Sequence, residues 1–156
     1  MRLPHFVLPV LLAGSLGAGT APDFTLKKLD GSVFKLRDAL GKKTIVVDFW
    51  ATWCAPCTKA LKKFQIIHDT RPDVLVLAVA IDDASSMAKV GQFIQGKGYT
   101  FQVLLDPDSS VMKLFNPSLN VPYTFVIDKQ GEIAYTHSGY VPGDEKELMD
   151  RLDGLK

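Results

Sequence analysis

The sequence predicts an α/β fold in which helices flank a mixed central sheet. Two apolar runs rich in β-branched residues, 44–51 and 74–81, are typical of central strands that are covered on both faces. Residues 55–68 lie between them and carry apolar side chains at helical spacing. The chain ends with a strand–turn–strand pattern and a helix, so we expect parallel strands in the first half and a hairpin in the second.

The other elements follow from turn and capping residues. Alternating apolar and polar residues surround Asp30-Gly31, which predicts an N-terminal β-hairpin followed by a short helical turn. An amphipathic segment with serines at its start and Gly96 or Gly98 near its end predicts a helix. In chain order, we expect the hairpin over 22–36, the turn over 36–40, a helix over 85–98, a strand over 100–106, a short helix over 108–116, strands over 123–128 and 132–138, and a helix over 143–155.

Length and charge limit the functional classes. The 156 residues are enough for one domain with a real core, and 18 basic against 17 acidic residues give a formal net charge of +1. This balance gives no reason to expect nucleic acid or an anionic membrane surface as a partner. We expect a monomer.

The first 21 residues differ from the rest of the chain. No charged residue occurs between Arg2 and Asp23, and the apolar run 6–13 is followed by small residues up to Ala21. This order predicts a secretory signal peptide, with an uncleaved membrane anchor as the alternative. We therefore expect an exported protein whose folded domain spans residues 22–156.

The chain's two cysteines, Cys54 and Cys57, follow the first apolar strand and lie at the expected start of a helix. The free N–H groups and dipole of a helix start favour an anion, and a thiolate there is reactive because its pKa is lowered. Cys54 is then the nucleophile, and Cys57 resolves the mixed disulfide that Cys54 forms. Trp53 and Pro56 should restrict the loop and shield Cys57.

A pair of cysteines can also bind a metal or form a structural disulfide. A closed zinc site needs four ligands, and His5, His68 and His137 make no spacing motif with the cysteines, so we expect no resident metal or other cofactor. A structural disulfide closing so small a loop would remove little entropy from the unfolded chain. The alternative function is that of a metal carrier in which the two cysteines bind Cu(I) with two-coordinate geometry.

The segment VDFWATWCAPC (47–57) resembles the active site of the thioredoxin superfamily, and the chain from APDFTL (21–26) onward resembles its exported TlpA/ResA-like branch. The resemblance implies a thioredoxin fold with an inserted helix and strand over residues 85–106. It also implies a thiol–disulfide oxidoreductase with a redox-active Cys54–Cys57 disulfide, acting on protein thiols or disulfides as a reductant, for example in cytochrome c maturation or disulfide repair. A membrane or soluble redox donor would be its second partner.

The same resemblance assigns further site residues. Val121-Pro122 in VPYTFVID (121–128) should be a cis peptide bond facing the cysteines, with the Val121 backbone open to an extended substrate. Asp48 matches the buried aspartate of thioredoxin, where the exported branch commonly has Asn. Burial should raise its pKa, and it could accept the proton of Cys57. Asp83 matches a position that is often acidic in the exported branch. It is only a secondary candidate, because a loop aspartate usually serves the turn.

Overall fold

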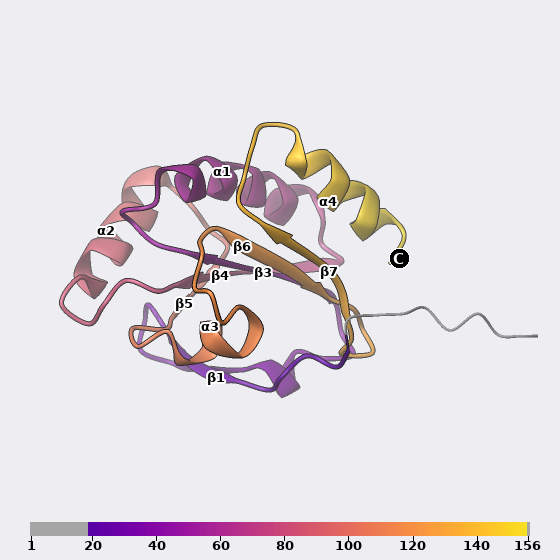
Figure 1. The fold of residues 1–156 in the computed structure, drawn as a ribbon, viewed down its shortest axis with the longest axis horizontal. Coiled ribbons are helices and arrows are strands. Elements are labelled where there is room, and N and C mark those ends of the chain that lie inside the picture. Colours follow the sequence, from indigo (N-terminus) through magenta and orange to yellow (C-terminus); the bar gives the residue numbers. More distant parts are fainter. Residues whose placement is uncertain (1–18, 156) are drawn as a thin grey trace, which may run out of the picture.

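The computed structural model describes residues 19–155, which form a three-layer α/β structure (Figure 1). Most of the predicted signal peptide or anchor lies outside the described residues. The helices and strands are β1 Thr25–Lys28, β2 Val33–Lys35, the 3-10 helix η1 Leu36–Asp38, β3 Thr44–Trp50, α1 Ala55–Thr70, β4 Val74–Ala80, α2 Met87–Lys97, β5 Gln102–Leu105, α3 Ser110–Phe115, β6 Tyr123–Ile127, β7 Ile133–Ser138 and α4 Asp144–Asp153.

A seven-stranded sheet in the order β2-β1-β5-β4-β3-β6-β7 forms the middle layer. β3, β4 and β5 run parallel, because helices α1 and α2 connect them, whereas β6, β7 and the N-terminal hairpin are antiparallel to their neighbours. The predicted thioredoxin fold with an N-terminal hairpin is confirmed. The inserted α2–β5 unit places β5 between β4 and β1, so the insertion joins the hairpin to the rest of the sheet.

Helices cover both faces of this sheet, with α1, α2 and α4 on one side and α3 on the other (Figure 1). All seven residues of β3 are buried, as expected for a central strand with covered faces. Alternate residues of β3 divide between two cores. Val46 and Trp50 face α1 and α4, whereas Ile45, Val47 and Phe49 pack toward α3 and the hairpin. Asp48 therefore lies on the α1 face.

The residues just before the predicted domain boundary at 22 are joined to the fold. The backbone N–H of Ala21 donates to the Gly131 carbonyl at 2.9 Å, and Ile133 N–H donates to Gly19 at 2.9 Å. The side chain of Thr20 also donates to Glu132. The boundary itself stays a prediction. Among the described helices, none has the length and apolar character needed to cross a membrane.

Candidate active site

The two cysteines lie where β3 passes through a short loop into α1. Cys54 is the N-cap residue of this helix, with Pro56 and Cys57 in its first turn. The cysteines form a disulfide with their Cα atoms 5.3 Å apart. The backbone N–H of Cys57 donates to Cys54 Sγ at 3.3 Å. After reduction, the Cys54 sulfur would keep this N–H and the helix dipole, which both stabilise a thiolate.

The surroundings of the two sulfurs differ in access to solvent. Cys54 is 5% exposed and Cys57 is completely buried, whereas the neighbouring Trp53 is 68% exposed. Pro56 is also exposed. An incoming sulfur atom would therefore meet Cys54 before Cys57. Trp53 would give the partner an apolar surface beside the disulfide.

The Val121-Pro122 bond is cis and lies at the same end of the sheet as the cysteine loop. Tyr123, the next residue, pairs with Phe49 near the end of β3. Val121 is half-buried and packs against the core cluster that contains both cysteines. The cysteine loop and the cis-proline segment, which the sequence predicts to face each other, thus lie at the same end of the sheet.

Asp48 is completely buried in the middle of β3, on the face that α1 covers. Its Oδ1 accepts a hydrogen bond of 2.8 Å from the hydroxyl of Thr124, its partner across the sheet. Among the described residues, Oδ2 has no hydrogen-bond partner. Burial raises the pKa of Asp48 well above its usual value, and the hydrogen bond from Thr124 lowers it only in part. Cys57 belongs to the core on the same face.

The neighbouring acids Asp82 and Asp83 have different surroundings. Asp83 is exposed and accepts hydrogen bonds from Ser85 and Ser86 in the turn before α2, which keeps its pKa low. Asp82, 1% exposed, accepts the backbone N–H of Thr52 at 3.0 Å and also bonds to its hydroxyl. Asp82 therefore anchors the loop that leads to Cys54.

Sequence reasoning missed Asp82 and Thr124 as neighbours of the site. The adjacent aspartates follow the same strand, and no local pattern distinguishes the buried carboxylate from the exposed one. Thr124 lies in a strand with four consecutive buried residues, so no alternation in the sequence distinguishes it from its neighbours. Among residues 19–155, no group of three or more His, Cys, Asp or Glu side chains could hold a metal ion.

A disulfide of this spacing, at a helix start beside a cis-proline and over a mixed sheet, defines a thioredoxin-like thiol–disulfide oxidoreductase. Residues 18–136 match the model of the AhpC/TSA family. The chain belongs to this family, within which it is thioredoxin-like.

Relatives and solved structures agree with this class. The chain is 36% identical over 138 residues to the thioredoxin-like protein YneN of Bacillus subtilis, covering 85% of this chain and 76% of YneN. It is 32% identical over 159 residues to the thiol-disulfide oxidoreductase ResA of the same organism, covering 99% and 86%. A Chlorobium tepidum structure assigned as thiol:disulfide interchange protein DsbE superimposes with a TM-score of 0.79 and 29% identity, over 89% of this chain and 96% of that one.

Proposed function

We propose that this protein is an exported reductant whose Cys54 and Cys57 dithiol reduces disulfides of protein substrates and becomes the Cys54–Cys57 disulfide. The observation that carries the proposal is the unequal burial of the two sulfurs at the start of α1, 5% exposed for Cys54 and none for Cys57. This arrangement supports separate roles, because attack needs an accessible thiolate and resolution needs a second thiol held close to it.

The exchange would proceed in two steps. The Cys54 thiolate attacks one sulfur of the substrate disulfide, which forms a mixed disulfide and releases the other substrate sulfur as a thiolate. Cys57 then loses its proton and attacks Cys54 Sγ, which breaks the mixed disulfide, closes the Cys54–Cys57 bond and releases the reduced substrate. Two electrons pass from the protein to the substrate.

Asp48 is the proposed acceptor of the Cys57 proton, directly or through a water molecule. Both residues are fully buried in the layer between β3 and α1, and Asp48 Oδ2 has no partner among the described residues. A carboxylate whose pKa is raised by burial is a stronger base than an exposed one. This supports a role in proton transfer.

The proposed substrate surface consists of Trp53, Pro56, Val121 and Pro122. Trp53 offers an exposed apolar ring, and Pro122 has no N–H of its own. An extended peptide could pair with the backbone groups of Val121 while its sulfur reaches Cys54. Asp83 stays a weaker candidate, since its hydrogen bonds serve the turn.

Export and the reducing direction belong to the proposal and are supported by the resemblance to ResA-like proteins and by the pattern of residues 1–21. Cytochrome c maturation or repair of wrongly oxidised cysteines would be the task. A membrane or soluble dithiol donor would restore the reduced state.

Trapping of intermediates tests the two roles. Cys57→Ser should accumulate mixed disulfides with partner proteins, because attack proceeds and resolution does not, whereas Cys54→Ser should accumulate none. Trapping by both variants or by neither would contradict the roles. Stoichiometric Cu(I) binding without any disulfide exchange would instead favour the metal carrier. The in-cell redox state of the cysteines reports direction, since a mostly reduced pair fits a reductant.

A further inference from the structure

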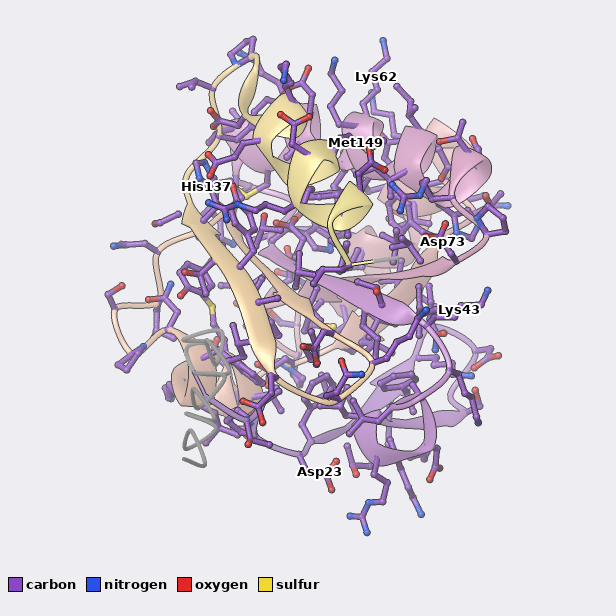
Figure 2. All side chains as sticks on the ribbon, turned by 90° about the vertical axis from the view of Figure 1, so that its right-hand side faces the viewer. Asp23, Lys43, Lys62, Asp73, His137 and Met149 are labelled. Atoms are coloured by element: carbon purple, nitrogen blue, oxygen red, sulfur yellow. A yellow bond between two sulfur atoms is a disulfide. The ribbon has the colours of Figure 1, made fainter. Side chains whose placement is uncertain are left out.

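A row of side chains crosses the sheet from the buried Asp48 toward solvent. Asp48 on β3 pairs with Thr124 on β6, and Thr124 pairs with His137 on β7. Directly paired residues point to the same face with Cβ atoms about 4.5–5.5 Å apart. Exposure increases along the row, from 0% at Asp48 and 6% at Thr124 to 29% for the His137 side chain. Figure 2 shows His137 on its strand beside helix α4.

A small cavity is lined in part by the second and third members of this row. Its volume is about 20 Å³, and its lining includes Thr124, His137 and Ala60. A cavity of roughly 10–15 Å³ or more can hold one water molecule when polar groups are within reach. Thr124 and His137 both line this cavity and both carry polar groups, so one water there could bridge their side chains.

The contact of His137 with Asp144, which lines the same cavity, determines which ring nitrogen carries the hydrogen. Nε2 lies 2.9 Å from Asp144 Oδ2, and the same carboxylate oxygen accepts the backbone N–H of Val141 at 2.8 Å. An ionised carboxylate only accepts, so Nε2 carries the hydrogen. The neutral ring then has its free electron pair on Nδ1, which can accept a proton.

Other ionisable groups line the cavity together with His137, and Lys63 balances the charge of Glu145 but not that of Asp144. Lys63 on α1 pairs with Glu145 on α4 at 2.6 Å, and this contact lowers the pKa of Glu145 to about 2. Burial raises the pKa of the two nearby phenols, which therefore stay neutral at ordinary pH. The groups are Lys63, Tyr135, Tyr140, Asp144 and Glu145.

We propose that Thr124 and His137 form a proton path between Asp48 and solvent. The inference rests on the proposed role of Asp48 as the acceptor of the Cys57 proton. In the oxidation of the dithiol, the S–H bond of Cys57 breaks and an O–H bond forms on Asp48. The proton then passes through the Thr124 hydroxyl and a cavity water to His137 Nδ1, and from there to solvent, which returns Asp48 to its carboxylate. Reduction of the disulfide uses the same path in reverse.

Two substitutions interrupt the path at different points. Thr124→Val removes the hydroxyl and nearly keeps the shape, and His137→Gln keeps a hydrogen-bond donor for Asp144 but cannot titrate. His68→Gln on α1 is the matched control, because His68 lies outside the cavity lining. The reduced proteins are mixed with an excess of a disulfide-containing peptide, and attack and resolution are followed as separate phases.

Resolution should slow about tenfold in both path variants, less than the roughly 10²–10⁴-fold that a directly acting base contributes. The attack phase and the His68→Gln control should match the unmodified protein. Added imidazole should restore resolution in His137→Ala but not in Asp48→Asn, since only the former lacks an external proton acceptor. Unchanged resolution in both path variants overturns the path.

The Asp48→Asn variant separates this failure from that of the proposed function. Slow resolution in Asp48→Asn with normal path variants would leave Asp48 as the base and remove only the path. Normal resolution in Asp48→Asn would remove both. Nitrogen NMR of the unmodified protein adds a test that does not depend on variants folding: a neutral His137 protonated on Nε2 supports the path, and one protonated on Nδ1 contradicts it.

Discussion

Replacing Asp48 with asparagine should stabilise the protein near neutral pH, and the reason lies in the surroundings of its carboxylate. The side chain is fully buried, and desolvation raises its pKa well above the usual value. A folded state with the higher pKa binds the proton more tightly than the unfolded chain does. Stability contributed by the protonated group is therefore complete below the unfolded pKa of about 3.9 and is lost as pH rises through the folded pKa.

The size of this stability difference depends on how far the pKa of Asp48 is raised and on the hydrogen bonds of its two carboxylate oxygens. Each pH unit between the unfolded and folded pKa values lowers the free energy of unfolding by about 1.4 kcal/mol. Asn keeps an acceptor for the 2.8 Å hydrogen bond from Thr124. Its amide replaces Oδ2, which has no partner among the described residues, so the unpaired donor costs about 1–3 kcal/mol. A protonated Asp48 leaves its O–H donor unpaired in the same way, so the two proteins should differ little near pH 4. The Asn variant should become the more stable one as pH rises.

Urea denaturation of both oxidised proteins from about pH 4 to 9 measures this difference without titrating thiols. Asp82→Asn is the matched control, because this buried aspartate accepts hydrogen bonds on both oxygens, from the backbone N–H of Thr52 at 3.0 Å and from the Thr52 hydroxyl. Losing one acceptor there should destabilise the protein by about 1–3 kcal/mol at neutral pH. An Asp48→Asn protein that is less stable at neutral pH and resolves mixed disulfides at the normal rate would refute the reasoning.

Three further predictions concern the surroundings of the site. Thr52→Val removes the hydroxyl bound to the buried Asp82 and should lower the free energy of unfolding by about 1–3 kcal/mol in urea denaturation, so an unchanged midpoint would contradict the anchoring role. Lys63→Met should raise the pKa of Glu145 from about 2 toward its usual 4.5 in an NMR titration, and a value still near 2 would show that Lys63 is not the cause. A chain beginning at residue 22 should be less stable to heat than one beginning at 19, since it lacks the hydrogen bonds that residues 19–21 make with residues 131–133. Equal melting temperatures would count against a stabilising role of these contacts.

Local patterns in the sequence were sufficient for the elements and for the cysteine site. The buried runs that became β3 and β4 and the helical spacing of α1 depend on neighbours a few residues apart. The position of Cys54 at the start of α1 follows from the adjacent strand and helix signals in the same segment. The hairpin and the turn before β7 followed from Asp-Gly and glycine positions.

The partners of the polar side chains came only from the tertiary structure. Sequence analysis could place Asp48 in a strand, but its hydrogen bond to Thr124 joins residues 76 positions apart. His137 lies in a predicted strand and makes no spacing motif with the cysteines, yet its Nε2 contacts Asp144 and the residue lines a cavity. These contacts depend on which strands are neighbours and in what register they pair.

The sequence by itself thus determined the secondary structure, the reactive cysteines and the class of chemistry, because short-range periodicity and capping report them. The tertiary structure decided which of two adjacent aspartates is buried, how the inserted strand β5 joins β1 to β4, and which groups surround Asp48. Sheet order and register bring distant segments together, and a one-residue slip would turn every side chain of a strand to the other face. No local pattern encodes that choice.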